Sequence, residues 1–328
     1  MVNIAVFTTV AQHRKGADIH LRNLQWALQG LDFKIYLQTF RDYSFDFDVE
    51  LIEAESNPSD FCFFWDKTGN YIREHCREAD LFLFTEQDIF FTKRLEGQIR
   101  LAHSNRSIQL NMESDYLSVF DHERNKLYPR IFEGATIIPA EYIFRAVDDG
   151  VALGSHPTQL FGGKYYTTSK NVKLEFRTIR DYIENSDYVD TLFEFSVFCF
   201  THNFPFLSHA SDFNYEASDS CVHFRAIEMM CHDCPRVYDD INEASSLASS
   251  RPSFNRLLNG CALMLLLSGA HERSPIMQEL LLNDHLNSLL WTRKKIDALC
   301  LFAKEWMTPA EYKNLLWAKQ VVHQKILM

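Results

Sequence analysis

Two carboxylates spaced two residues apart, Glu86 and Asp88, are the side chains of this sequence best suited to chemistry. They follow the charge-free apolar run 81–84 (LFLF) and precede three more apolar residues, 89–91. Ligands of open α/β sheets bind at the carboxyl ends of strands, and residues at i and i+2 of an extended chain project to the same side. We therefore expect Glu86 and Asp88 to reach one divalent cation, Mg²⁺ or Mn²⁺, which prefers oxygen ligands and is often shared with substrate phosphates.

The spacing alone is common in this chain. Five other pairs show it: Asp46/Asp48, Glu53/Glu55, Glu78/Asp80, Glu113/Asp115 and Asp121/Glu123. Only the pair at 86 and 88 ends an apolar strand, which favours the metal-binding interpretation. The alternative is a solvated turn in which Asp88 caps a helix.

The elements that must position this pair alternate between strand and helix. Apolar runs predict strands at 3–10, 33–40 and 80–84. Leucines at helical spacing (Leu21, Leu24, Leu28, Leu31) predict a helix capped by Asp18 and stopped at Gly30. A second helix is expected to open at 58–60. This order predicts an α/β fold with a mostly parallel sheet flanked by helices.

The rest of the chain is expected to add smaller elements and a helical end. Short apolar runs at 108–110 and 135–138 are followed by a predicted helix at 190–203. From residue 254 the pattern becomes helical, with a helix start at Ser274-Pro275 and a capping box in 308–311 (TPAE).

We divide the chain into two predicted units on this basis. Residues 1–245 are expected to form one α/β domain, in two parts at 1–95 and 96–245. Residues 246–328 are expected to form a helical C-terminal subdomain.

Composition narrows the function classes. The 328 residues are 46% hydrophobic and 23% charged, which excludes a disordered chain. The formal charge of −11 argues against sequence-independent binding to nucleic acid. The longest apolar run, 261–267, is too short to span a bilayer, and the first residues lack the pattern of an export signal. We therefore expect a cytoplasmic protein whose eight cysteines are reduced.

The layout of residues 3–88 resembles the nucleotide-sugar-binding half of glycosyltransferases with the GT-A fold. The segment Glu86-Gln87-Asp88 looks like their DxD motif, with Glu in place of the first Asp. The resemblance implies that Asp88 is the primary ligand of Mn²⁺ or Mg²⁺, and that Glu86 supports it or contacts the donor sugar. The donor would be a nucleotide sugar of the UDP or GDP class.

The same resemblance implies roles for residues outside this motif. Thr8, Thr9 and Val10 would lie against the nucleotide, and Arg14 and Lys15 of the following loop could approach phosphate. An exposed loop is the alternative for these two cations. The loop has one glycine, Gly16, so that neither a Walker phosphate loop nor a dinucleotide glycine motif is present.

The resemblance also implies a general base and a third metal ligand. Asp190, at the predicted start of a helix, is the candidate base, with Glu194 as the second choice; a simple helix cap is the alternative for Asp190. His223, between Val222 and Phe224, is the candidate metal ligand. His156 and His209 compete with it for that role.

A zinc site is the rival metal hypothesis. Cys221, His223, Cys231 and Cys234 contain one pair at zinc spacing, but the other pair is too close for a standard structural site.

The sequence thus predicts a metal-dependent glycosyltransferase that moves a sugar to a hydroxyl acceptor. The acceptor could be a glycan, a protein, a lipid or a hydroxylated DNA base, the last being disfavoured by the net charge. The alternatives are a nucleotidyltransferase and a non-catalytic scaffold that retains a GT-A-like fold.

Overall fold

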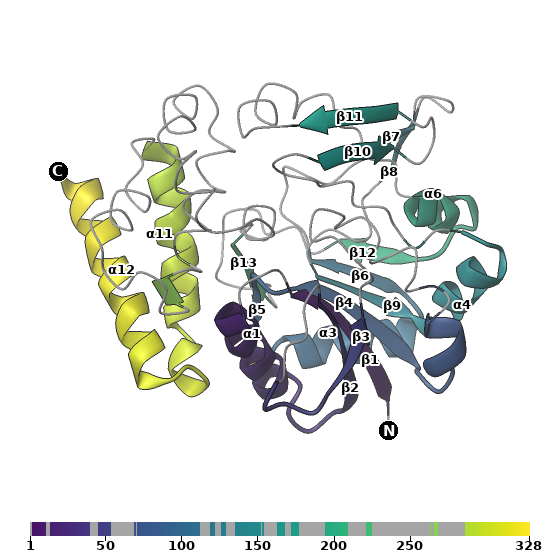
Figure 1. Cartoon of the computed structure of the whole chain (residues 1–328), viewed down its shortest axis with the longest axis horizontal. Coiled ribbons are helices and arrows are strands. Elements are labelled where there is room, and N and C mark those ends of the chain that lie inside the picture. The colour runs from purple at the N-terminus through teal and green to yellow at the C-terminus, as the bar shows by residue number, and fades with distance from the viewer. Residues whose placement is uncertain are drawn as a thin grey trace.

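The computed structural model of the chain is built around one large sheet with helices on both faces (Figure 1). The description below concerns residues 2–10, 14–39, 45–53, 69, 71–111, 119–121, 126–128, 135–151, 153, 163–167, 172–176, 194–208, 221–224, 263, 266–267 and 286–328.

The central sheet has seven strands in the order β12-β6-β9-β4-β1-β2-β3. Their bounds are β1 Asn3–Val10, β2 Asp32–Thr39, β3 Val49–Glu53, β4 Leu81–Glu86, β6 Ile108–Asn111, β9 Ala135–Pro139 and β12 Phe206–Ser208. Every pair is parallel except those that β9 makes with β4 and β6. The expected α/β fold with a mostly parallel sheet is confirmed.

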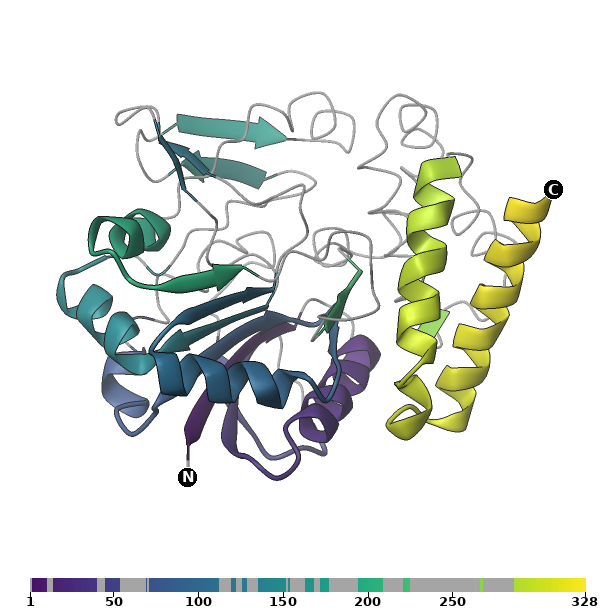
Figure 2. The same ribbon diagram turned by 180° about the vertical axis from the view of Figure 1, so that it is seen from behind.

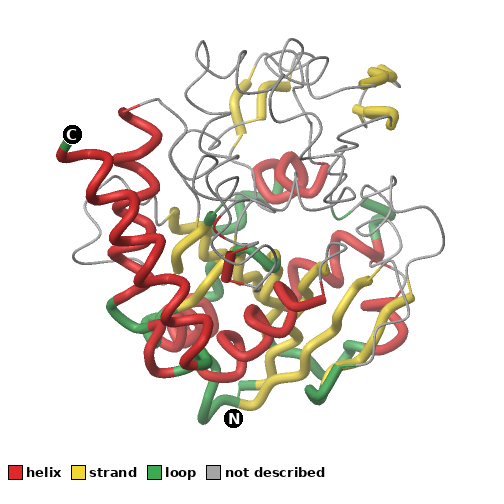
Figure 3. Tube along the Cα trace, turned by 60° about the vertical axis from the view of Figure 1, so that its left-hand side comes forward, coloured by secondary structure: helices red, strands yellow, loops and turns green. Residues whose placement is uncertain are grey.

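The strands bury both faces because their side chains alternate. Ile4 and Val6 of β1 pack with helices α1 (Arg14–Ala27) and α3 (Leu95–Asn105) on one face. Ala5 and Phe7 of the same strand face the other core. That second core includes α4 (Ala140–Asp148), α6 (Glu194–Thr201) and the C-terminal helices, as the tube in Figure 3 helps to follow.

Helix α1 begins earlier than the sequence pattern predicts. Its first residue is Arg14, so that Asp18 lies inside the helix and is not its N-cap. Arg14, Lys15 and Ala17 are good helix formers, and they extend the helix toward β1. The predicted stop is confirmed: Gly30 has φ of 91°, a left-handed conformation that ends the turn after the helix.

Three strand pairs lie outside the central sheet. Strand β5 (Ile89–Phe91) pairs with β13 (Cys221–His223) in an antiparallel ladder. The other two pairs are β7 (Val119–Asp121) with β8 (Lys126–Tyr128), and β10 (Gly163–Thr167) with β11 (Val172–Phe176).

The C-terminal part consists of α11 (Leu286–Cys300), the short 3₁₀ helix η3 (Ala303–Glu305) and α12 (Pro309–Leu327). The predicted capping box is confirmed, with Thr308 Oγ1 accepting from the amide of Glu311 and the Glu311 carboxylate accepting from the amide of Thr308. In the described part of the chain, the helices are all too short or too polar to cross a membrane.

These C-terminal helices pack directly against α1 and β5 (Figure 2). The ring of Trp306 stacks on Phe90 of β5 with centroids 5.4 Å apart, and Phe302 stacks on Trp26 of α1 at 5.8 Å. Glu311 forms an ion pair with Arg22 of α1. One core cluster joins the sheet and these helices. The domain boundaries at 95 and 245 stay predictions.

Several predicted elements lie on residues outside the described ranges. These are the helix start at 58–60, the helix start at Ser274-Pro275 and the first residues of the 190–203 helix. Within the described part, that last helix runs over Glu194–Thr201 as α6.

Candidate functional site

The carboxyl ends of β1 and β4 lie side by side. Their parallel register pairs Thr8 with Thr85 and Thr9 with Glu86. The sheet therefore brings the end of the first strand next to the first predicted carboxylate, as the sequence pattern indicated. Thr8 is 1% exposed and Glu86 is 8% exposed, so that both lie inside the protein.

The chain turns directly after Glu86, which corrects one prediction. Gln87 and Asp88 form a turn between β4 and β5, so that the extended geometry used to place both carboxylates on one side is absent. The alternative of a solvated, helix-capping Asp88 is also wrong. Asp88 is 0% exposed and is followed by strand β5.

Strand β13 lies beside the second carboxylate. The amide of Phe224 donates to the carbonyl oxygen of Asp88 at 3.0 Å, and His223 stands opposite Ile89 in the ladder. His223 therefore lies on a strand, as its place between the apolar Val222 and Phe224 suggests. Its backbone lies one ladder position from Asp88, although the two residues are far apart in the sequence. Its role as a metal ligand stays a prediction.

Helix α1 supplies a histidine that sequence analysis missed. His20 is 0% exposed; its Nδ1 lies 2.9 Å from the carbonyl oxygen of Ile89, and its Nε2 lies 2.9 Å from Thr8 Oγ1. A carbonyl oxygen only accepts. Nδ1 of the neutral ring therefore carries the proton, and Nε2 accepts from the Thr8 hydroxyl.

The surroundings of His20 favour its neutral form. Burial lowers the pKa of His20 to about 4, and the hydrogen bond to Ile89 and the charge of Asp88 only partly oppose this. The imidazole is therefore neutral at pH 7. It joins the end of β1 to the start of β5.

Asn23 makes a second link between α1 and β5. Its Nδ2 donates to the carbonyl of Phe91 at 3.0 Å, and its Oδ1 accepts from the amide of Phe91 at 2.6 Å. His20 and Asn23 lie three positions apart and share one face of the helix. Polar residues set among the apolar Leu21 and Leu24 of a buried face are the signal that could have revealed them.

The residues present fit a hard divalent cation in part. Glu86 and Asp88 supply oxygen ligands, which Mg²⁺ and Mn²⁺ prefer. Within the described ranges, no group of three or more His, Cys, Asp or Glu side chains is placed to share an ion. One or two carboxylates completed by substrate phosphates and water is the usual arrangement for Mg²⁺. Glu86 and Asp88 are the carboxylates that would hold such an ion.

A buried lysine of the C-terminal part is another residue that sequence analysis missed. Lys295 of α11 is 1% exposed and shares the buried face of that helix with Thr292. Helix α11 packs against β13, next to the predicted site. Burial of an ammonium group is costly unless the charge is compensated, so Lys295 and its surroundings are part of the packing of α11.

The structure locates the other predicted site residues as follows. Arg14 is the first residue of α1, and Lys15 is the second. Glu194 begins α6, which lies at the opposite end of the central sheet from β5 and β13 (Figures 1 and 2). Asp190, His156, His209, Cys231 and Cys234 lie outside the described residues, so that the general base and the zinc hypothesis stay predictions.

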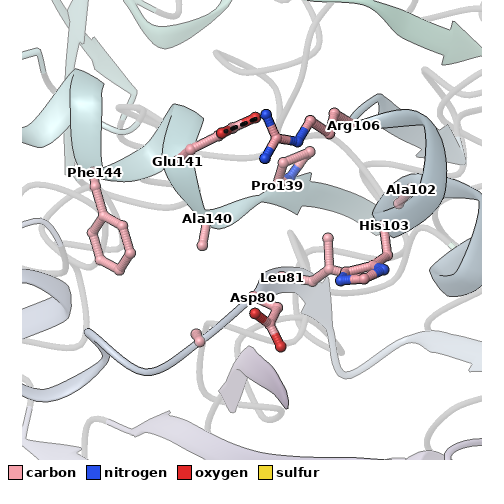
Figure 4. Close-up of a pocket in the computed structure, with 10 residues that line it drawn as sticks. Asp80, Leu81, Ala102, His103, Arg106, Pro139, Ala140, Glu141 and Phe144 are labelled. Atoms are coloured by element: carbon pink, nitrogen blue, oxygen red, sulfur yellow. Dashed lines mark ion pairs between the residues drawn. The ribbon is translucent and has the colours of Figure 1, made fainter. Parts of the chain in front are cut away.

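A cavity of about 310 Å³ lies at the opposite end of β4 (Figure 4). Asp80 and Leu81 line it at the amino end of that strand, together with Phe144 of α4. Arg106 and Glu141 border it and form an ion pair at 3.6 Å. Strand β4 thus separates this cavity from Glu86, and we do not assign it to the candidate site.

Comparisons with known proteins give weak similarities. No protein-family model matches this chain, and no curated protein matches it. The chain is similar to the crystal structure of S. aureus TarS residues 1–349, with 10% identity, a TM-score of 0.36 and coverage of 98% of this chain and 92% of that one. A longer TarS structure gives the same identity and TM-score, with 99% of this chain and 54% of that chain covered.

A third similar structure is a glycosyltransferase involved in glycosylation of the major capsid of PBCV-1. It has 12% identity and a TM-score of 0.33 over 63% of this chain and 81% of that chain. At these scores the similarities carry no argument about activity, which must come from the site itself.

Proposed function

We propose that this protein is a metal-dependent glycosyltransferase of the GT-A type. It would transfer a sugar from a nucleotide diphosphate donor, of the UDP or GDP class, to a hydroxyl acceptor. The observation that carries the proposal is the placement of Glu86 and Asp88. Both are buried carboxylates at the carboxyl end of β4, beside the end of β1 in a parallel sheet, where ligands of α/β sheets bind.

The proposed reaction needs positive charge beside a diphosphate. Cleavage of the bond between the sugar and the phosphate leaves negative charge on the diphosphate, and a bound Mg²⁺ or Mn²⁺ would neutralise it. In the proposed site Asp88 is the primary ligand of the ion. Glu86 supports it or contacts the donor sugar, and His223 is the candidate third ligand.

We propose that the other contacts with the donor come from the end of β1 and the start of α1. Thr8, Thr9 and Val10 would lie against the nucleotide, and Arg14 would approach its phosphates from the start of α1.

The segment that follows Asp88 is anchored in both cores of the protein. Ile89 and Phe91 pack in the core that includes α1 and α3, whereas Phe90 packs in the other core. Phe224, whose amide donates to the carbonyl of Asp88, is 1% exposed. This packing would hold Asp88 in place for the proposed ion.

The proposed reaction also needs a base beside the acceptor hydroxyl. An inverting transferase needs a carboxylate that takes the proton of the attacking hydroxyl. Asp190 is the proposed base; Glu194, the second choice from the sequence, begins α6 at the other end of the sheet (Figure 1) and is not proposed. A glycan, a protein, a lipid or a hydroxylated DNA base would each provide the hydroxyl.

The test is ligand-dependent thermal stabilisation. The melting temperature is measured with UDP, GDP, CDP and ADP, each with and without Mn²⁺, because a ligand of the native state raises it. We expect one nucleoside diphosphate to stabilise the protein only when Mn²⁺ is present. Asp88→Asn should abolish that effect. The matched control is Asp148→Asn, since Asp148 of α4 has a side chain that is 73% exposed and lies outside the site.

Other outcomes would support the alternatives. Stabilisation by nucleoside triphosphates alone would favour a nucleotidyltransferase. The absence of any nucleotide effect would favour a scaffold. Release of UDP or GDP from the matching nucleotide sugar by the wild-type protein, but not by Asp88→Asn, would then show cleavage of the sugar–phosphate bond, and an increase in that release on addition of a hydroxyl acceptor would show transfer.

A further inference from the structure

We propose that His20 and Asn23 of α1 are positioning residues that hold the Asp88 turn in its metal-binding geometry and couple it to the nucleotide end of β1. This inference rests on the proposed function. It assigns the task of placing the carboxylate to a helix that contributes no carboxylate itself.

The first step is the hydrogen bonding of β5, which alternates between two neighbours. The carbonyl of Asp88 faces β13, where it accepts from Phe224. In an antiparallel ladder the next bonded pair comes two residues later, so Phe90 also bonds toward β13, opposite Val222. The backbone groups of Ile89 and Phe91 therefore point the other way, toward α1.

On the side of β5 that faces away from β13, side chains of α1 bind its backbone, as a second strand would do. His20 donates to the carbonyl of Ile89, and Asn23 bonds both the amide and the carbonyl of Phe91. Buried backbone groups that lose their hydrogen-bond partners destabilise the fold. The three bonds thus fix the strand that starts one residue after Asp88, and with it the direction of the turn.

The second nitrogen of His20 extends the link to β1. With the proton on Nδ1, Nε2 accepts from the Thr8 hydroxyl at 2.9 Å. A movement of the Asp88 turn, transmitted through Ile89, would then shift the imidazole and the end of β1. We infer that ion binding at Asp88 and nucleotide binding at β1 favour one another through this ring.

Two substitutions of His20 each remove one of the two hydrogen bonds that its imidazole makes. The amide nitrogen of Asn can occupy the position of Nδ1, whereas the longer Gln side chain places its amide near the position of Nε2. His20→Asn should keep the bond to Ile89 and lose the bond to Thr8. His20→Gln should keep the bond to Thr8 and lose the bond to Ile89.

The experiment measures Mn²⁺ affinity with and without the nucleoside diphosphate that stabilises the wild-type protein. The electron paramagnetic resonance signal of free Mn²⁺ reports the affinity without reference to turnover. We expect His20→Gln to bind Mn²⁺ at least tenfold more weakly under both conditions. His20→Asn should stay within threefold of wild type without nucleotide and should lose the gain in Mn²⁺ affinity that the nucleotide gives the wild-type protein. Equal affinity in all three proteins, or equal losses in both variants that follow their melting temperatures, would overturn the inference.

The wild-type protein provides a readout that requires no variant. Nitrogen-15 spectra of labelled histidines should show His20 as the neutral Nδ1–H tautomer at pH 7, with ring resonances that shift when Mg²⁺ and the nucleotide bind together. Unchanged His20 resonances under saturating ligand would contradict the coupling. If wild type binds neither metal nor nucleotide, the proposed function fails; if it binds both and His20 does not respond, this inference alone fails.

Discussion

The amide nitrogen of Phe224 lies 3.0 Å from the carbonyl oxygen of Asp88 and donates a hydrogen bond to it. This contact joins a strand in the second half of the chain to the turn that carries the proposed metal ligand. It fixes the register of β13, in which His223 stands opposite Ile89. The position of His223 is thereby tied to that of Asp88.

That register leads to a prediction for His223. If it completes the proposed metal site, His223→Ala should weaken Mn²⁺ binding in the presence of nucleotide by about tenfold or more, a loss of about 1.4 kcal/mol. Isothermal titration calorimetry with Mn²⁺ would measure this. His103→Ala is the control, because His103 is exposed and borders the cavity at the other end of β4. An unchanged affinity in His223→Ala would remove His223 from the ligand set.

The pKa of His20 predicts a stability that depends on pH. Its folded value of about 4 lies below the ordinary value of 6.5, so that the unfolded chain binds more protons between these two limits. The contribution of His20 to the free energy of unfolding should therefore be full above pH 6.5 and should fall as pH decreases toward 4, by about 3 kcal/mol in total. Urea denaturation at several pH values measures it.

His20→Asn is the comparison for that measurement, because asparagine does not titrate in this range. The variant should show a smaller loss of stability between pH 6.5 and pH 4 than the wild-type protein. Parallel pH profiles for the two proteins would show that His20 titrates normally in the folded state.

The stacking of Trp306 on Phe90 predicts that the C-terminal helices stabilise the site. Truncation of a buried aromatic side chain typically costs about 3–5 kcal/mol, and Trp306 is 8% exposed. Trp306→Ala should lower the free energy of unfolding by about that amount and should weaken nucleotide binding. Leu301→Ala is the control, since Leu301 is 83% exposed, and it should change stability by less than about 0.5 kcal/mol. Full nucleotide affinity in a folded Trp306→Ala protein would argue that the site is independent of these helices.

Lys295 of α11 offers a test of how this helix is packed, since it is 1% exposed. Removal of one member of a buried, compensated charge pair typically costs about 3–5 kcal/mol. Lys295→Met should therefore lower the melting temperature and the free energy of unfolding in urea. Lys313→Met, on the exposed side of α12, is the matched control and should change both by little. An unchanged melting temperature in Lys295→Met would show that the charge of Lys295 does not stabilise the fold.

Local pattern in the sequence was sufficient for much of the fold. Apolar runs specified β1, β2 and β4, because strands covered on both faces are mostly apolar. The Thr308 capping box specified the start of α12, since its two hydrogen bonds form within four residues. The placement of Glu86 at a strand end also followed from the residues.

What the tertiary structure decided depends on contacts between distant segments. The antiparallel strand β9, the edge strand β3 and the pairing of β13 with β5 rest on hydrogen bonds that no local period encodes. The same holds for His20 and Asn23. Their role follows only from the packing of α1 on β5, where they bind the backbone groups of Ile89 and Phe91 that do not face β13. The sequence thus identified which carboxylates could bind a cation, whereas their burial and orientation came from the packing of α1 and β13 around the turn.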